Sequence, residues 1–233
     1  MKKIQSPMSK SLNNTEQAWI KETESSIVQK FDNAIAELNN SGIAKTALQV
    51  GDKVMDFELM NASDKRVKLS DILQKGPVVL TWYRGGWCPY CNVQLQYLQQ
   101  ELPQFKKQGA SLMALTPELP DKSLNTKEKN ELEFEILTDL NNEVARKFGI
   151  VFSLNSELVK IYNGRLKTFN GVDTNELPIP ATYIIGQDYL IKYAFVDPNH
   201  RHRAEPTHIV SVLKTLKAIQ PNTSFEQDMK NEH

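Results

Sequence analysis

The sequence has few cysteines and histidines, no excess of basic over acidic residues and no long apolar run. It contains two cysteines and four histidines in 233 residues. Lysine plus arginine and aspartate plus glutamate both total 28, which gives a formal net charge of +0. Nucleic-acid-binding domains usually carry a basic excess, and no apolar run here approaches the length of a membrane span. We therefore expect no nucleic-acid partner and no membrane.

The first residues carry no export signal that we recognise. Two lysines, Lys2 and Lys3, are followed by polar residues and not by the apolar segment of a signal peptide. This predicts a cytoplasmic protein whose thiols lie in a reducing environment. Cysteines in such a compartment are more often catalytic than structural.

The two cysteines lie two residues apart, in Trp87-Cys88-Pro89-Tyr90-Cys91. The apolar run 78–80 before them predicts a buried strand. The residues after them repeat apolar positions in steps of three and four, which predicts an amphipathic helix. Proline suits the first position of a helix. The pair is therefore expected where a strand ends and a helix begins.

This position favours redox chemistry. The helix N-terminus carries a partial positive charge that stabilises a thiolate, and the thiolate is the reactive form of cysteine. A second thiol three residues later can close a disulfide with the first. Two alternatives are a pair of structural cysteines and half of a zinc site. Zinc needs two further ligands, and none of the histidines has an established ligand spacing from the pair. We expect no metal and no cofactor.

The remaining pattern predicts an α/β sandwich with a central mixed sheet. We expect a disordered N-terminus over 1–13, one long helix over 14–42, the main domain over 46–219 and a flexible tail over 220–233. Within the domain we expect a hairpin at 57–69, buried strands at 78–80, 111–115 and 135–138, a loop over 163–176, a hairpin at 181–195 and a last helix at 206–218. Pro103 is expected to kink or break the helix that follows the cysteines, and Ser156 to cap a helix that runs to Tyr162.

From about residue 48 to 216 the chain resembles the peroxiredoxin-like (AhpC/TSA) branch of the thioredoxin superfamily. The resemblance rests on Val50-Gly51-Asp52 with Asp56-Phe57, on the stretch from Arg84 to Cys91, on Leu177–Tyr183 and on Tyr193–Asp197. It implies a thioredoxin-like fold and a thiol-dependent oxidoreductase. It also implies that Pro180 is a cis-proline facing the disulfide.

The chain departs from the usual peroxiredoxin motif. The positions of the usual Pro, Thr and peroxidatic Cys fall on Arg84, Cys88 and Cys91, and the later active-site arginine lines up near Pro180. Arg84 or Arg203 could replace that arginine, but we expect both to be surface or salt-bridging residues. The comparison with thioredoxin makes Cys88 the attacking thiol, whereas the comparison with peroxiredoxins makes it Cys91. Exposure at the mouth of the helix favours Cys88 for a bulky substrate.

We expect Cys88 and Cys91 to be catalytic, with Arg84, Trp87 and Pro180 facing the substrate. The favoured function is reduction of peroxides through a dithiol–disulfide cycle, with an external thiol donor such as a thioredoxin-type protein. The alternatives are a thioredoxin-like reductase of protein disulfides and a redox-sensing interaction module. The apolar stripe of the N-terminal helix must be covered, either by the chain's own domain or by a second copy of the chain, and we predict a homodimer through this helix. The basic stretch His200–Arg203 is expected to be a solvated loop.

Overall fold

A mixed sheet of seven strands forms the centre of the molecule, in the order β2-β1-β5-β4-β3-β8-β9. The computed structural model describes residues 6–219. Strands β3, β4 and β5 are parallel, and the remaining pairs are antiparallel. A short second sheet pairs β6 with β7. The predicted α/β architecture with a mixed sheet is confirmed.

The elements follow one another as α1 (Pro7–Glu22), α2 (Ser25–Asn40), α3 (Ile43–Thr46), β1 (Glu58–Asn61), β2 (Arg66–Lys68), α4 (Leu69–Leu73), β3 (Val78–Trp82), α5 (Pro89–Lys107), β4 (Ser111–Thr116), α6 (Pro120–Lys129), β5 (Glu135–Thr138), a 3₁₀ turn (Leu140–Asn142), α7 (Glu143–Lys147), β6 (Val151–Ser153), α8 (Ser156–Tyr162), α9 (Arg165–Asn170), β7 (Glu176–Pro178), β8 (Thr182–Ile185), β9 (Ile191–Phe195) and α10 (Pro206–Ile219).

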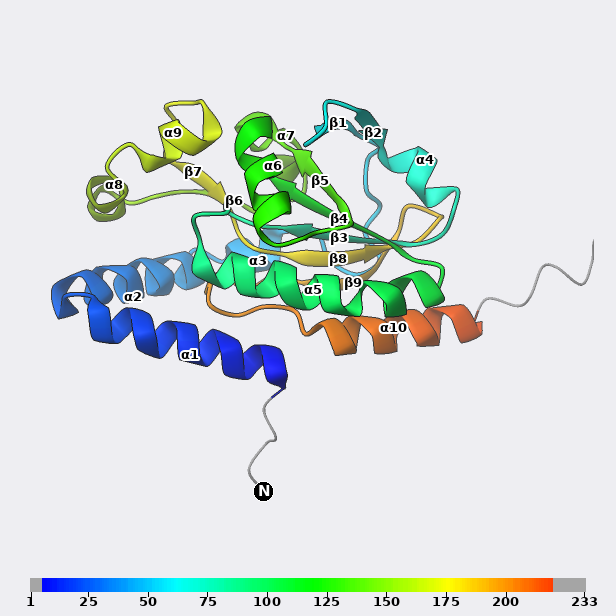
Figure 1. Ribbon diagram of the computed structural model, residues 1–233, viewed down its shortest axis with the longest axis horizontal. Helices are drawn as coiled ribbons and strands as arrows, with labels where there is room; N and C mark the ends of the chain where they lie inside the picture. The colour runs from blue at the N-terminus through cyan, green and yellow to red at the C-terminus, as the bar shows by residue number, and fades with distance from the viewer. Residues whose placement is uncertain (1–5, 220–233) are drawn as a thin grey trace, which may run out of the picture.

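Helices cover both faces of the sheet (Figure 1). On one face, side chains of α1, α5 and α10 share a core with alternate residues of β3, β4, β5 and β8. On the other face, α4 and α7 pack against the residues in between. This alternation follows from the period-two geometry of a strand.

Strand β3 positions the cysteine pair. All five of its residues are buried, and it lies between parallel β4 and antiparallel β8. Helix α5 starts at Pro89 and buries the predicted apolar stripe. The prediction that Pro103 breaks this helix is wrong, because α5 continues to Lys107. Pro103 lies on the exposed side of the helix, where water can solvate the backbone carbonyl that the missing N–H leaves free.

The N-terminal segment differs from the expected single helix. Ser6 accepts a hydrogen bond from the Ser9 N–H and starts α1 at Pro7, so the expectation of disorder over 1–13 is wrong from that point onward. Thr23 and Glu24 are extended and separate α1 from α2. Met8 and Leu12 of α1 are buried in the core that α5 helps to form. The two helices lie along the same side of the molecule (Figure 1).

The predicted loop over 163–176 contains helix α9. Asn163 and Gly164 adopt the left-handed conformation between α8 and α9, and Gly171 adopts it after α9. The Asn-Gly sequences therefore end helices here, which is a frequent use of these residues. Asn155, and not Ser156, caps α8 through a hydrogen bond from the Leu158 N–H.

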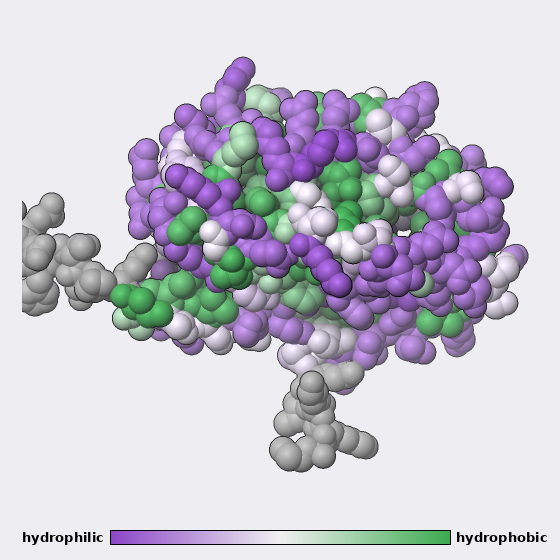
Figure 2. All heavy atoms as spheres, turned by 180° about the vertical axis from the view of Figure 1, so that it is seen from behind, coloured by the Kyte–Doolittle hydropathy of each residue, from purple (hydrophilic) through white to green (hydrophobic). Residues whose placement is uncertain are grey.

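The surface seen from behind is mostly hydrophilic, with apolar side chains gathered near its middle (Figure 2). Among residues 6–219, no helix combines the length and the apolar character that crossing a membrane requires. The tail predicted over 220–233 lies outside the described residues, as do residues 1–5.

Candidate active site

The two cysteines lie at the start of α5, at the end of the sheet where β3 finishes. Cys88 is the residue before the first helical position, and Cys91 lies in the first turn. Both thiols are free, and both residues are 0% exposed. The prediction that Cys88 is exposed at the mouth of the helix is therefore wrong. A bulky protein disulfide cannot contact either sulfur in this conformation.

Arg84 contacts the sulfur of Cys88. It lies in the segment between β3 and α5, and its Nη2 donates to Cys88 Sγ at 3.2 Å. Its Nη1 donates to the hydroxyl of Tyr162 at 3.3 Å. Arg84 is 5% exposed and forms no ion pair with a carboxylate within residues 6–219. The expectation that it is a surface or salt-bridging arginine is wrong.

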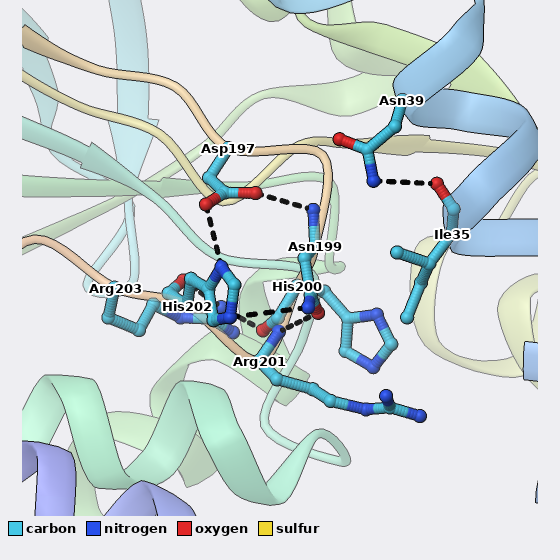
Figure 3. Close-up of polar contacts among 8 residues, drawn as sticks. All are labelled: Ile35, Asn39, Asp197, Asn199, His200, Arg201, His202 and Arg203. Carbon is cyan, nitrogen blue, oxygen red and sulfur yellow. Dashed lines mark hydrogen bonds and ion pairs between the residues drawn. The ribbon is translucent and has the colours of Figure 1, made fainter. Parts of the chain in front are cut away.

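Arg203 contacts the sulfur of Cys91, as Arg84 contacts that of Cys88. It is also 5% exposed, and its Nη2 donates to Cys91 Sγ at 3.4 Å. Its Nη1 donates to the backbone carbonyls of His200 and His202. Figure 3 shows how the loop folds back on itself to hold this side chain, with Asp197 accepting from the Asn199 N–H and contacting His202. Each thiol therefore faces its own guanidinium.

The environment separates the pKa values of the two thiols. Burial by itself raises the pKa of Cys88, but a hydrogen bond from Cys91 and the charges of Arg84 and Arg203 outweigh it, and the pKa lies well below the usual value. Burial and the negative charge of Cys88 raise the pKa of Cys91 well above its usual value. The position of Cys88 at the helix N-terminus acts in the same direction as the arginines. The favoured state is a Cys88 thiolate beside a Cys91 thiol.

A buried carboxyl group supports the turn that carries Cys88. Glu118 follows β4, is 0% exposed and accepts a hydrogen bond from the Gly86 N–H at 2.9 Å. Thr126 donates to its other oxygen at 3.5 Å. Burial raises the pKa of Glu118 to about 7 despite these bonds. The sequence analysis missed this residue, although it follows a strand whose end meets the cysteine pair at the same edge of the sheet.

A cavity of about 200 Å³ lies beside Arg84. Arg84 and Trp87 line it, whereas Cys88 does not. The cavity is lined by Trp19, Ile27, Phe31, Arg84, Trp87, Pro89, Tyr90, Ile161, Tyr162, Arg165, His200 and Arg201. Arg84 thus connects the cavity with the sulfur.

Two further residues differ from the expectations. Pro180 is not a cis-proline, since the described chain contains no cis peptide bond, and trans is the favoured state of an ordinary X-Pro bond. Pro180 is buried and lines a small second cavity together with Arg84. His200 is not part of a fully solvated loop, because its ring packs against Tyr90 and Phe31 at centroid distances of 5.5 and 6.3 Å. His202, by contrast, is exposed as expected.

Within residues 6–219, no group of three or more histidine, cysteine, aspartate or glutamate side chains is placed to hold a metal ion. The polar atoms that gather at the cysteines are instead donors. The Nε of Arg84, the indole N–H of Trp87 and the hydroxyl of Tyr90 are buried without a hydrogen-bond partner in the described part of the chain. These donors match a ligand rich in oxygen lone pairs.

Comparisons with known proteins agree with this chemistry. A model of the AhpC/TSA family matches residues 50–194. Peroxiredoxin Bcp of Escherichia coli is 30% identical over 117 residues, which are 50% of this chain and 74% of that protein. The thiol-disulfide oxidoreductase ResA of Geobacillus kaustophilus is 28% identical over 130 residues, 52% of this chain and 74% of that protein.

Solved structures show the same fold. Peroxidoxin BcpB from Mycobacterium tuberculosis superposes with a TM-score of 0.60 at 23% identity, covering 75% of this chain and 99% of that chain. A PrxQ mutant from Xylella fastidiosa gives a TM-score of 0.57 at 19% identity, covering 73% of this chain and 96% of that chain. The family implies a peroxide as substrate. The chain belongs to the AhpC/TSA family, the peroxiredoxin thiol peroxidases and related thiol-disulfide oxidoreductases of the thioredoxin superfamily.

Proposed function

We propose that this chain reduces peroxides with Cys88 as the attacking thiolate and Cys91 as the resolving thiol. The observation that carries the proposal is the contact of 3.2 Å between the Arg84 guanidinium and Cys88 Sγ. Arg84 is buried and forms no carboxylate ion pair within residues 6–219. A guanidinium without a carboxylate partner is strongly attracted to a thiolate, because both charges are removed from water.

The reaction has two chemical steps. The Cys88 thiolate attacks one peroxide oxygen, the O–O bond breaks, and the products are a Cys88 sulfenic acid and an alkoxide, or a hydroxide from hydrogen peroxide, that takes up a proton. The Cys91 thiol then attacks the sulfenic sulfur, an S–S bond forms, the S–O bond breaks and water leaves. The peroxide is reduced by two electrons, and the dithiol is oxidised to a disulfide.

Arg84 can act on both reactants. Its Nη2 contacts the sulfur, and its Nε has no partner in the described residues although the side chain lines the cavity. Donors aimed at the oxygen that gains charge stabilise the transition state. Arg84 thereby takes the place of the Thr and Arg of the usual motif. We place Trp87 at the cavity wall facing the peroxide, and Pro180 as packing that helps to fix the Arg84 side chain.

Two other assignments compete with this one. The alignment with peroxiredoxins makes Cys91 the attacking residue, but the raised pKa of Cys91 opposes it. Reduction of protein disulfides is favoured by the likeness to ResA, but the complete burial of both cysteines opposes it. A redox-sensing module remains the alternative without catalysis.

The cycle needs an external electron donor. We propose a dithiol protein of the thioredoxin type, which reduces the Cys88–Cys91 disulfide by thiol–disulfide exchange. Because both sulfurs are buried, the donor needs the segment around them to open. A cycle that depends on an external thiol donor needs a reducing compartment, so we propose the cytoplasm.

A homodimer through the N-terminal helices stays a proposal. Part of the stripe that motivated it packs within the chain, since Phe31 packs beside α8, Leu38 packs against the core that α7 helps to form, and Trp19 meets Phe31 edge to face. Polar side chains predominate over the part of the surface that α2 occupies in Figure 2. Light scattering of the full chain distinguishes a 26.5 kDa monomer from a dimer of twice that mass.

The test of the function compares the wild type with Cys88→Ser and Cys91→Ser. Stopped-flow fluorescence follows oxidation by hydrogen peroxide and by cumene hydroperoxide, and a dimedone-type probe traps sulfenic acid. We expect Cys88→Ser to lose rapid oxidation and Cys91→Ser to keep it and accumulate sulfenic acid. The reverse result makes Cys91 the attacking residue. Insulin reduction without accelerated peroxide reaction supports the disulfide-reductase assignment, and a lack of both reactions contradicts the enzyme proposal.

A further inference from the structure

The cavity beside Cys88 is built to a large extent by segments outside the matched family domain. Of its twelve lining residues, five lie outside residues 50–194. Three of them come from the N-terminal helices: Trp19 from α1, and Ile27 and Phe31 from α2. His200 and Arg201 come from the loop after β9. The shape of this cavity is therefore not set by the family domain alone.

The N-terminal side of the cavity is aromatic and apolar. Trp19 and Phe31 meet edge to face with centroids 5.3 Å apart, and Phe31 lies 6.3 Å from Tyr162. Trp87 meets Tyr162 at 5.4 Å. Such rings present large apolar areas with little freedom to rearrange. An apolar ligand body is therefore favoured over water in this space.

One of the three arginines that line the cavity is neutralised by carboxylates of the protein itself, whereas Arg84 and Arg165 form no ion pair within residues 6–219. Arg201 pairs with Asp32 at 2.8 Å and with Glu16 at 3.3 Å, and its guanidinium lies over the Trp19 ring. Burial and the nearby arginines keep the pKa of His200 well below its usual value, so this ring is uncharged at neutral pH. The buried donors of lining residues that lack a partner in the described chain are Nε of Arg84, the indole N–H of Trp87, the hydroxyl of Tyr90, and Nε and Nη2 of Arg201, and of these residues Arg84 contacts the Cys88 sulfur.

The volume sets the size of the ligand. The cavity measures about 200 Å³, and an apolar protein cavity of roughly 150 Å³ is known to take up one benzene molecule. One compact ring with a short polar group therefore fits. Because the cavity is partly open to solvent, a long alkyl chain extends beyond the apolar wall into water, and hydrogen peroxide leaves most of the apolar wall without contact.

We propose that the two N-terminal helices select the substrate, and that Trp19, Ile27 and Phe31 favour an organic hydroperoxide with one compact aromatic or branched apolar group over hydrogen peroxide. This inference rests on the proposed peroxidase function. The apolar body lies against the N-terminal wall, and the peroxide group lies toward the unpartnered donors of Arg84, Trp87 and Tyr90. The helices are then part of the specificity pocket as well as of the fold.

The test fills the cavity without removing a core side chain. Ile27 is half-buried and lines the cavity, so Ile27→Trp occupies its space. Ile20→Trp is the matched control, because Ile20 is 41% exposed on α1 and does not line the cavity. Rate constants for oxidation of Cys88 are measured with cumene hydroperoxide and hydrogen peroxide in wild type and both variants. Circular dichroism checks that each variant is folded.

We expect the wild type to prefer cumene hydroperoxide, and Ile27→Trp to lower the ratio of the two rate constants by about tenfold or more. Ile20→Trp should leave the ratio unchanged. In the wild type, 2-phenyl-2-propanol, the product alcohol, should give a saturable change in tryptophan fluorescence, since Trp19 and Trp87 line the cavity.

Three outcomes overturn the inference and are distinguishable. A wild type that reacts with both peroxides, with a ratio that Ile27→Trp does not change, overturns the substrate selection and leaves the peroxidase function in place. A wild type that reacts with neither peroxide overturns the proposed function and this inference together. Reaction with equal rate constants in the wild type also contradicts the selection.

Discussion

Arginine contacts distinguish the two thiols at the scale of single residues. Arg84 reaches Cys88 and Arg203 reaches Cys91, and both guanidinium groups are buried. Several other arginines and lysines pair with carboxylates at the surface, as Arg146 does with Glu176, where such pairs contribute little stability. Arg84 is instead placed where its charge sets the reactivity of a sulfur.

Replacement of Arg84 should slow peroxide reduction. In Arg84→Met the pKa of Cys88 rises, because a charged donor to the thiolate is lost while burial of the sulfur remains. Hydrogen bonds to charged groups contribute about 1.5–3 kcal/mol, so the rate constant at neutral pH should fall by about ten- to a hundredfold. The measurement is stopped-flow oxidation across pH, with Arg146→Met as the control.

The dependence of the oxidation rate on pH shows in which direction Arg84→Met moves the pKa of Cys88. Thiolate is present above the pKa of Cys88 and is lost as the pH falls through it, so the lowered pKa keeps the wild type reactive below neutral pH. In Arg84→Met this fall in rate should move to higher pH. A lower rate with an unmoved pH profile contradicts an effect on the thiolate.

Glu118 should make stability depend on pH. Its folded pKa of about 7 lies above the reference value of 4.5, so the folded state holds the proton more tightly than the unfolded state. The stability from this group is fully present below about pH 4.5 and is lost as the pH rises to about 7. Glu118→Gln removes this dependence, because a neutral amide can still accept from the Gly86 N–H.

Urea unfolding at pH 5 and pH 8 measures the dependence. The free energy of unfolding of Glu118→Gln minus that of the wild type should be larger at pH 8 than at pH 5. The size of the pKa shift sets this change at about 2–3 kcal/mol. Glu128→Gln, on the exposed side of α6, is the control. A difference between wild type and Glu118→Gln that is the same at both pH values shows that Glu118 does not bind its proton in this way.

Arg201 joins three separate pieces of the chain at the scale of secondary-structure elements. It lies in the loop after β9, pairs with Glu16 of α1 and Asp32 of α2, and lies over the ring of Trp19. The two N-terminal helices are thus fixed to the loop that also carries Arg203. This connection helps to keep the cavity and Cys88 covered.

Replacement of Arg201 should make Cys88 more accessible. In Arg201→Met both ion pairs are lost, while Glu16 and Asp32 keep contact with water because their side chains are 27% and 45% exposed. Local opening of α1 and α2 should then be easier. The reduced protein should react with a bulky maleimide about tenfold faster, with little loss of overall stability. Arg146→Met is again the control. An unchanged labelling rate in Arg201→Met would show that Arg201 does not hold α1 and α2 against the loop after β9.

Sequence patterns predicted the elements that have strong periodicity. The stripe of α5 and the apolar run of β3 fixed the place of Cys88 and Cys91. The patterns did not predict the features that depend on contacts between residues far apart in the sequence. Thr23 and Glu24 separate α1 from α2, but neither residue type forbids a continuous helix, so the local sequence does not predict the break. Likewise, Arg203 lies 112 positions from Cys91, and no local motif relates the two.

Segments on both sides of the matched region contribute to the active site at the scale of the whole molecule. The matched region covers 50–194, while α1 and α2 precede it, and the loop that carries Arg203 and helix α10 follow it. Both flanking segments contact the start or the length of α5 (Figure 1). The active site thus combines cysteines from the matched region with side chains from both flanking segments, and both cysteines are enclosed as a result.

The cysteine count of the whole chain determines the form of the oxidised protein. There are two cysteines in 233 residues, and both are buried in the same site. Oxidation by one equivalent of hydroperoxide should therefore consume two thiols and give an intramolecular disulfide, because residues three apart on a helix are neighbours. Thiol titration and peptide mapping measure the loss and the pairing.

The same oxidised sample should migrate as a single chain of 26.5 kDa in non-reducing electrophoresis. Cys91→Ser provides the contrast, since its Cys88 sulfenic acid has no resolving thiol and persists until an external thiol reaches it. Because the site is enclosed, that external reaction should be slow in Cys91→Ser and faster when Arg201→Met is added. A disulfide-linked dimer of the wild type after one equivalent of oxidant would show that Cys88 is resolved between chains, and that the enclosed pair described here does not form the catalytic unit.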